Sequence, residues 1–363
     1  LCPNVVTFVC ILKACGNDNG IYRGGQIHSM ISGWNLIEID VVLGNALVDM
    51  YVKCGVVAKA DEVLQELPVR DVYSWSALIS GYTQQLQCYE ALNCFKLMQD
   101  EGFSPNVVTF LSILRACAST GDIDKGEKIH EQIVIRGLLE NDTMLGTALL
   151  DMYAKCGFLV KAQRVFEDLS VRDVVSWSAL IGGYAENGQG HKALEFFKQM
   201  QCEGLFPNEV TFVCILKACS SIGALDIGEQ INQEITIRGL LGENIILDTA
   251  LVDMYAKCGM LAKAQRFHDK LAVRSIVAWN TLILGYVQQG QGRTAFDIFE
   301  LMQIEGVSPD SLTFVSALKV CANTGNISKG KQIHDELVAK GLPGEDTMLG
   351  SALVDMYGKC GML

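Results

Sequence analysis

The sequence predicts an all-α fold, a solenoid of tandem helix-turn-helix repeats. One observation is a long period: the string Asp-Met-Tyr-x-Lys-Cys-Gly at 49–55 recurs at 151–157, 253–259 and 355–361, a step of 102 residues each time. A second is that apolar residues within each period follow helical spacing and are interrupted by Gly-containing turns. A fixed step held over three cycles indicates a repeat array, because chance local resemblances do not keep their spacing.

The stretch 72–106 predicts one helical hairpin. Its first helix is indicated by apolar residues at i, i+3, i+4 and i+7, which are Trp75, Leu78, Ile79 and Tyr82. A polar turn follows, and a second apolar stripe consists of Leu92, Phe95 and Met98. Gly102 and Pro105 then end the hairpin, since neither residue type favours a helix interior.

The next two stretches repeat the pattern with different lengths. The first stripe of 107–142 is Phe110, Ile113, Leu114 and Cys117, and that of 143–173 is Leu149, Met152, Tyr153 and Cys156. Gly157 stands where the end of a helix favours a residue that can take positive φ. The three stretches have 35, 36 and 31 residues and together fill the 102-residue period.

Laid over the chain, these hairpins predict one uninterrupted array spanning 1–363, in which stacked neighbours bury the face that a lone hairpin cannot. We call the 36-residue stretches L units, the 31-residue stretches S units and the 35-residue stretches P units. The L units are 5–40, 107–142, 209–244 and 311–346. The S units are 41–71, 143–173, 245–275 and a truncated 347–363. The P units are 72–106, 174–208 and 276–310. Because the chain begins and ends inside repeats, we interpret it as a fragment without its targeting segment.

The composition narrows the classes of function. No apolar run reaches the ~18 residues that a membrane span requires, so no membrane partner is expected. The 14 cysteines include no Cys-x-x-Cys, and eight of them keep the period as small apolar residues. We therefore expect a reducing compartment and neither a metal nor a cofactor. The net charge of −12, taken alone, argues against a nucleic-acid partner.

Three strings nevertheless carry a resemblance to a known family. They are Val-Val-Ser-Trp-Ser-Ala-Leu-Ile-Gly-Gly-Tyr at 174–184, Ala-Leu-Val-Asp-Met-Tyr-Ala-Lys-Cys-Gly at 250–259, and Gly-Lys-Gln-Ile-His at 330–334. With the alternating lengths, the whole chain resembles pentatricopeptide repeat (PPR) proteins of the PLS subclass, which alternate P, L and S motifs. The resemblance implies a right-handed superhelical α-solenoid, similar to tetratricopeptide repeats, that binds single-stranded RNA with one base per repeat.

The same resemblance implies a cellular compartment and a role in RNA processing. Proteins of this subclass act in mitochondria or chloroplasts, and most are associated with C-to-U RNA editing. The partners expected from the family are single-stranded organellar RNA and proteins of an editing complex. We expect this chain not to be an enzyme itself, although a full-length protein of this subclass often ends in a deaminase-like domain.

In the family, the fifth and last residues of each motif face one base. The corresponding pairs here are Asn45/Asp71, Ser76/Asn106, Thr147/Asp173, Ser178/Asn208, Thr249/Ser275 and Asn280/Asp310. All twelve are short hydrogen-bonding side chains, as reading a Watson–Crick edge requires. A competing interpretation is that they are helix N-caps and loop carboxylates.

The family's code assigns a base to most of these pairs. Both Asn/Asp pairs favour U, both Ser/Asn pairs favour A, and Thr147/Asp173 favours G, whereas Thr249/Ser275 has no assignment. The fifth residues of the L units cannot donate or accept, so their bases stay unread; they are Val9, Leu111, Val213 and Val315. With the protein parallel to the RNA, as in the family, the hypothesis is 5′-N-U-A-N-G-A-N-N-U-N-3′. Second residues such as Val42, Val175 and Val277 would pack on the base faces.

RNA binding conflicts with the acidic net charge unless positive side chains gather on the binding face, and the repeats contain candidates for this role. Four lie one helical turn beyond the fifth position of the L units and are expected on the face that reads the bases, next to the RNA backbone; they are Lys13, Arg115, Lys217 and Lys319. The S units add Lys53, Lys155, Lys257 and Lys359. Each of these follows an Asp by four residues, so the alternative is an ion pair on the helix surface. The L-unit cations are the better candidates.

Two alternatives to RNA binding remain open. A protein–protein scaffold of the tetratricopeptide type would place no constraint on the fifth and last positions. An enzyme would need a set of catalytic residues, and the sequence contains only two incomplete catalytic motifs. The phosphate-loop-like segment 325–331 lacks the required Ser or Thr, and His334-Asp335-Glu336 lacks the Cys-x-x-Cys of a zinc deaminase.

Overall fold

The structure is a computed structural model that describes residues 3–34, 36, 40–139, 142–341 and 346–362. These residues form 21 α-helices and no β-strand. They divide into two compact units, Leu1–Gly183 and Tyr184–Leu363, and the boundary falls within helix α11 (Val174–Glu186). Each unit is described by itself, and both are all-α repeat solenoids, as the sequence predicts.

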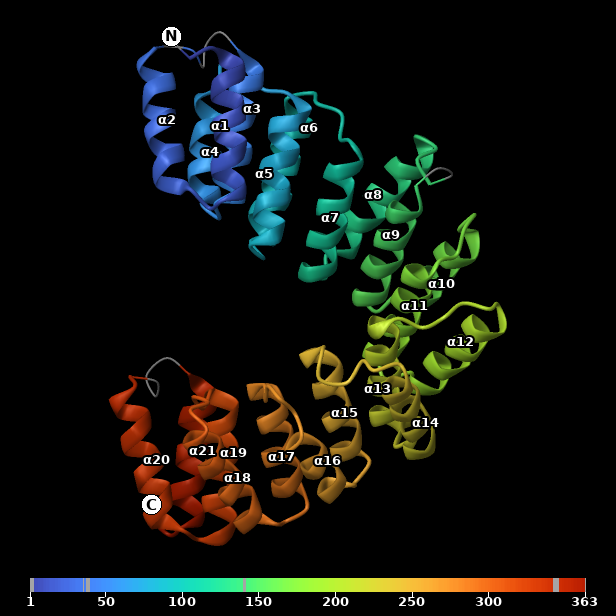
Figure 1. The fold of residues 1–363 in the computed structure, drawn as a ribbon, viewed down its shortest axis with the longest axis vertical. Coiled ribbons are helices and arrows are strands. Elements are labelled where there is room, and N and C mark those ends of the chain that lie inside the picture. The colour runs from blue at the N-terminus through green and yellow to red at the C-terminus, as the bar shows by residue number, and fades with distance from the viewer. Residues whose placement is uncertain (1–2, 35, 37–39, 140–141, 342–345, 363) are drawn as a thin grey trace. The chain divides into compact units, whose positions relative to one another are not determined.

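The first unit contains ten complete helices (Figure 1). They are α1 (Val5–Asn17), α2 (Ile21–Gly33), α3 (Val41–Lys53), α4 (Val57–Glu66), α5 (Val72–Gln84), α6 (Cys88–Asp100), α7 (Val107–Thr120), α8 (Ile123–Ile135), α9 (Thr143–Lys155) and α10 (Leu159–Asp168). The odd-numbered helices pack on one another in sequence, from α1 to α9. The even-numbered helices from α2 to α8 each pack on the odd-numbered helices before and after them, and α10 packs on α9, so the unit has two layers.

The second unit repeats this arrangement. Its helices are α12 (Gly190–Cys202), α13 (Glu209–Ile222), α14 (Leu225–Ile237), α15 (Ile245–Lys257), α16 (Leu261–His268), α17 (Ile276–Gln288), α18 (Gly292–Ile304), α19 (Ser311–Thr324), α20 (Ile327–Ala339) and α21 (Thr347–Lys359). The helices α13, α15, α17, α19 and α21 pack on one another in sequence, and the even-numbered helices cover them. Every complete predicted hairpin that lies within one unit therefore contains one helix from each layer.

Local sequence fixes where the helices end. Gly157 follows α9 with a φ of 84°, in the left-handed region, as its place in the sequence predicts. Gly121 ends α7 in the same way with a φ of 71°, and its N–H donates to the carbonyl of Cys117. A residue with a Cβ is strained at these φ values, so glycine lets the chain turn directly into the second helix.

The cores repeat with the same period as the sequence. The stripe residues Trp75, Leu78 and Ile79 are buried, and so are the equivalent tryptophans Trp177 and Trp279. A second recurring contact joins L and S units, where Gly126 of α8 lies against Met152 of α9. A Cβ added to this glycine would lie 2.6 Å from the methionine Sδ, so a larger residue would require the methionine side chain to shift.

Histidines and cysteines of the repeat serve packing. Nδ1 of His130 lies 2.9 Å from the Tyr153 hydroxyl, and one period later the amide of Asn232 donates to Tyr255 at 3.0 Å. The period-keeping cysteines of the L units, such as Cys117, are buried. Those of the S units donate their thiols to the carbonyls of these buried cysteines. Over the part of the chain that the structure describes, no helix is long and apolar enough to cross a membrane.

Candidate nucleic-acid interface

The last residue of each complete S and P unit begins the next helix. Each of these six side chains accepts a hydrogen bond from a backbone N–H in the first turn of that helix; they are Asp71, Asn106, Asp173, Asn208, Ser275 and Asp310. Asn, Asp and Ser are preferred at this position because their short side chains satisfy N–H groups that the helix leaves free. The N-cap interpretation is therefore correct for all six. It is compatible with base reading, because a cap need not use every polar atom.

The cap fixes which atom of an asparagine is free. Asn106 Oδ1 accepts from Thr109 N at 2.9 Å and also lies 2.9 Å from the Thr109 hydroxyl. Asn208 makes the same two contacts with Thr211. Since only the amide oxygen can accept, Nδ2 is directed away from the cap. It remains available as a donor and makes no hydrogen bond with any residue that the structure describes.

Several predicted pairs touch directly. The Asn45 amide donates to Asp71 Oδ2 at 2.9 Å, and the Asn280 amide donates to both oxygens of Asp310 at 3.1 Å. In the S unit 245–275, the hydroxyls of Thr249 and Ser275 lie 2.9 Å apart. These contacts join side chains 26 or 30 residues apart, as the predicted pairing requires.

A threonine at the third position of the L unit bridges the pair that precedes it. The Thr109 hydroxyl lies 2.7 Å from Ser76 Oγ and 2.9 Å from Asn106 Oδ1. The Thr313 hydroxyl lies 2.6 Å from Asn280 Oδ1 and 2.7 Å from Asp310 Oδ1. Neither threonine is among the residues that the sequence assigns to the site, and their contact with it is visible only in the structure.

The fifth residues differ in exposure. Ser76, Ser178 and Asn280 of the P units are each 4 % exposed, whereas Asn45, Thr147 and Thr249 of the S units are half-buried. The last residues are half-buried or exposed. A ligand thus meets the last residue first, and the fifth residue of a P unit lies behind it.

Hydrogen bonds keep one of these carboxylates ionised. Burial opposes the charge of Asp310, but hydrogen bonds from Thr313 and Asn280 outweigh it and lower the pKa of the carboxyl below its usual value. Asp310 is therefore a pure acceptor at neutral pH.

Apolar side chains at the second position form an exposed set. Every unit contributes one, and they are 41–72 % exposed; they are Val6, Val42, Tyr73, Val108, Met144, Val175, Val210, Ile246, Val277, Leu312 and Met348. Three of them were predicted to pack on bases. In the structure the exposed set covers all eleven units and includes four aliphatic or methionine side chains longer than valine and one aromatic side chain. Exposed apolar side chains at so regular a spacing mark a binding surface better than scattered ones do.

The L-unit cations are exposed. Lys13, Arg115 and Lys319 form no ion pair with any described residue. Lys217 lies 3.1 Å from Glu186, and 52 % of its side chain is exposed. Three unpaired cations and one exposed ion pair are therefore available to an anionic ligand.

The S-unit lysines are paired instead. Each amino group lies 2.8 or 2.9 Å from the carboxylate of the Asp four residues earlier, and the pairs are Asp49–Lys53, Asp151–Lys155, Asp253–Lys257 and Asp355–Lys359. The ion-pair alternative is thus the one that the structure supports for these residues.

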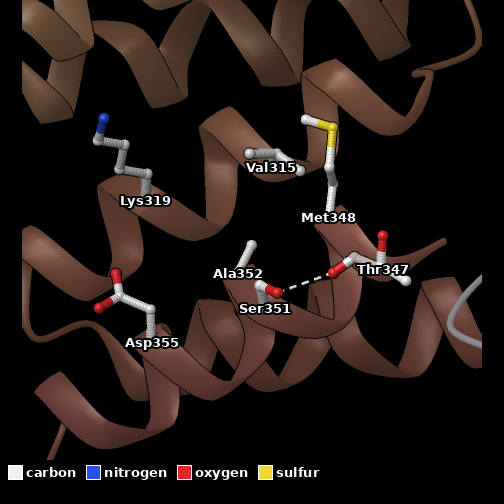
Figure 2. Close-up of a pocket in the computed structure, with 7 residues that line it drawn as sticks. All are labelled: Val315, Lys319, Thr347, Met348, Ser351, Ala352 and Asp355. Carbon is white, nitrogen blue, oxygen red and sulfur yellow. Dashed lines mark hydrogen bonds between the residues drawn. The ribbon is translucent and has the colours of Figure 1, made fainter.

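A pocket of about 400 Å³ lies where the last L unit meets the last S unit, between α19 and α21. Figure 2 shows Val315 and Lys319 reaching into it from α19 and Met348 from α21. Ser351, the fifth residue of the truncated S unit, donates to the carbonyl of Thr347 at 2.8 Å. The pocket thus gathers residues from the fifth, second and cation positions of two neighbouring units.

Metal chemistry has no evident site in the described residues. No group of three or more His, Cys, Asp or Glu side chains is placed to hold an ion there. His334, part of the deaminase-like string, has its Nδ1 2.9 Å from the hydroxyl of Tyr357.

Comparison with protein families gives matches along most of the chain. A model described as PPR repeat family matches residues 70–119, 172–221 and 274–323. A second model, described as PPR repeat, matches 45–72, 108–138, 147–174 and 249–276.

Curated proteins and solved structures agree with these matches. A chloroplastic pentatricopeptide repeat-containing protein of Arabidopsis thaliana is 33 % identical over 98 % of this chain and 57 % of its own length. A putative mitochondrial one from the same plant is 34 % identical over 97 % of this chain and 56 % of its own length. The chain thus spans little more than half of these relatives. The crystal structure of the pentatricopeptide repeat protein PPR10 in complex with an 18-nt psaJ RNA element matches with a TM-score of 0.71 at 18 % identity, over 97 % of this chain and 57 % of that one.

Proposed function

Because this chain belongs to the pentatricopeptide repeat family, we propose that it binds single-stranded RNA and reads one base with each S or P unit. The observation that carries the proposal is the match between the hydrogen-bonding atoms of the fifth/last pairs and the Watson–Crick edges of bases. The RNA element bound to PPR10 supports RNA as the class of ligand.

The Ser/Asn pairs suit adenine. Ser76 Oγ donates its only hydrogen to the Val72 carbonyl at 2.6 Å and can then only accept from a ligand. The capped Asn106 offers its Nδ2 as a donor. Adenine presents the complement, an N6 amino donor beside the N1 acceptor. By the family's code the pair Ser178/Asn208 is also assigned adenine; Ser178 donates to the Val174 carbonyl at 2.7 Å, and Asn208 caps α13.

The pairs that contain aspartate suit bases with a ring N–H. A carboxylate can only accept, so Asp173 and Asp310 would accept from N1–H of guanine or N3–H of uracil. Beside Asp310, the Asn280 amide can donate to a uracil carbonyl. Beside Asp173, the Thr147 hydroxyl can accept from the guanine amino group. These matches give U for the Asn/Asp pairs and G for Thr147/Asp173.

The rest of the surface supports a nucleic-acid strand. The eleven exposed second-position side chains are suited to contact with base faces, which is a sequence-tolerant source of affinity. Lys13, Arg115 and Lys319 supply positive charge for phosphates despite the acidic net charge. The proposed target is 5′-N-U-A-N-G-A-N-N-U-N-3′.

We place this binding in a chloroplast or mitochondrion, the compartments in the names of the relatives. There the chain would recognise the sites of C-to-U editing and would cooperate with other proteins of an editing complex. Its contribution would be recognition rather than catalysis.

Selection from a random pool of single-stranded RNA tests the proposal. The 363-residue chain should enrich sequences related to the proposed target, and it should not retain a double-stranded pool of the same length. Enrichment of no RNA, together with retention of peptides from a random peptide library, would favour a protein-binding scaffold instead.

A further inference from the structure

We infer that the S unit 245–275, whose Thr249/Ser275 pair has no assigned base, takes guanine. The inference rests on the proposed function, since it concerns the base held by one unit of the same surface. It is argued from the positions of the hydroxyl hydrogens of these two residues.

The hydrogen of Thr249 is already used. Its Oγ1 lies 2.7 Å from the carbonyl oxygen of Ile245, one turn earlier in α15. A carbonyl can only accept, so the threonine hydroxyl must donate to it at that distance. A hydroxyl has one hydrogen and two lone pairs, and Thr249 can therefore only accept from any other partner.

The hydroxyl hydrogen of Ser275 is therefore donated to Thr249. Its Oγ lies 2.9 Å from Thr249 Oγ1, and because Thr249 cannot donate there, Ser275 must. Ser275 also accepts the N–H of Ala278 at 3.1 Å, the bond that caps α17. One lone pair remains on each hydroxyl, so the pair presents two neighbouring acceptors and no donor.

Only one base offers two neighbouring donors on its Watson–Crick edge. Guanine carries N1–H beside the N2 amino group, whereas adenine and cytosine each place one amino donor beside a bare ring nitrogen. Uracil places a single N3–H between two carbonyls. Against two acceptors, every base except guanine leaves at least one acceptor without a donor and turns its own lone pair toward it.

The pair is also accessible to a base. Both side chains are half-buried, unlike the P-unit residues Ser76 and Asn280, which are almost fully covered. In the other S unit that favours a purine, Thr147/Asp173, an aspartate oxygen supplies the second acceptor. Ser275 would supply the same kind of atom without the charge.

The test uses the ten-nucleotide RNA 5′-UUAUGAUXUU-3′ with G, inosine, A, C or U at X, and the readout is fluorescence anisotropy. Guanine at X should bind about threefold to tenfold more tightly than adenine, the usual effect of one neutral hydrogen bond. Inosine, which lacks only the N2 amino group, should lie between them. Equal affinities for all five bases, or a preference for adenine, would overturn the inference.

Two variants at one position sharpen the test, and both keep a residue that caps helices well. S275D keeps two acceptors and should retain the preference for guanine. S275N offers an amide donor and should shift the preference to adenine. A loss of binding when G is replaced at the fifth nucleotide, which the pair Thr147/Asp173 reads, is the internal control. If that control holds and X has no effect, only this inference fails; if no RNA binds at all, the proposed function fails.

Discussion

The amide of Asn280 donates to both carboxylate oxygens of Asp310 at 3.1 Å, across 30 residues of sequence. The two side chains belong to one unit, yet Asp310 also caps the first helix of the next unit. A single carboxylate thus links the end of one repeat to the start of another.

Replacing the capping asparagines by aspartate should change the preferred base without harming the fold. In N106D and N208D the Oδ1 cap is kept, but the free atom becomes an acceptor instead of a donor. We expect the preference at the third and sixth nucleotides to move from A to G, by about tenfold in relative affinity. Binding to RNAs with A or G at these places measures it, and an unchanged preference for A would refute the assignment.

Removing the unpaired cations should weaken binding to every RNA sequence alike. For K13Q/R115Q/K319Q we expect the slope of log affinity against log salt to fall by about 2, because each lost phosphate contact contributes roughly 0.7 for single strands. The matched control is K53Q/K155Q/K359Q, whose lysines are held by aspartates one turn away. A salt slope that falls as much in the control would show that the distinction between the two sets is wrong.

Neighbouring glycines of α2 should respond in opposite directions to alanine. In G24A the new Cβ would meet Met50 Sδ at 2.5 Å, and we expect a loss of about 1–3 kcal/mol in the free energy of unfolding. In G25A nothing lies within 4 Å of the new Cβ, and we expect a gain of about 0.5–1 kcal/mol. Thermal unfolding followed by circular dichroism compares the two, and equal shifts would contradict the close contact between α2 and α3.

Buried His268 should make stability depend on pH. Both ring nitrogens lack a hydrogen-bond partner among the described residues, and burial, reinforced by Arg274, lowers the histidine pKa although Asp269 opposes the shift. Below about pH 6.5, where the unfolded histidine takes up a proton that the folded one resists, stability should be lost; above it, stability should be constant.

The equivalent residue one period earlier supplies the matched variants. Phe166 packs edge-on against Trp177 with ring centres 4.6 Å apart, as His268 does against Trp279 at 4.3 Å. H268F should therefore raise the melting temperature at pH 7 and flatten its decline toward pH 5, and F166H should do the reverse. If H268F melts at the same temperature as the parent at both pH values, the unpaired imidazole does not have the expected cost.

The repeat geometry could be predicted from sequence because it is local. The stripe of Trp75, Leu78 and Ile79 alone determines which face of α5 is buried, and Gly157 had to follow a helix end. Side-chain partners depend on neighbouring units and could not be predicted in this way. By its spacing, Lys53 suits either a free cation in the groove or an ion pair with Asp49. Only the structure shows that the ion pair forms. The near-complete burial of Ser76 likewise results from packing against Thr109 in the next unit.

Departures within the third period illustrate the same limit. Asp248 stands where other S units have Gly44 or Gly146, and it is buried with its carboxylate accepting from the N–H of Gly242 at 3.2 Å. Burial raises the pKa of this carboxyl, which the backbone hydrogen bond partly offsets. The helix that follows, α16, is also shorter than α4 and α10. A period found in sequence does not reveal how one unit adapts to such a change.

Under the proposed function, the residues that cap the helices also contact bases, and this limits how the chain can acquire new RNA targets. A side chain that starts a helix is restricted to the few residue types that folding tolerates there. Evolution, or a protein engineer, can therefore change the recognised base only by exchanging Asn, Asp, Ser and Thr at these positions. Any other residue would change the recognised base and would also remove the cap, which destabilises the helix that follows.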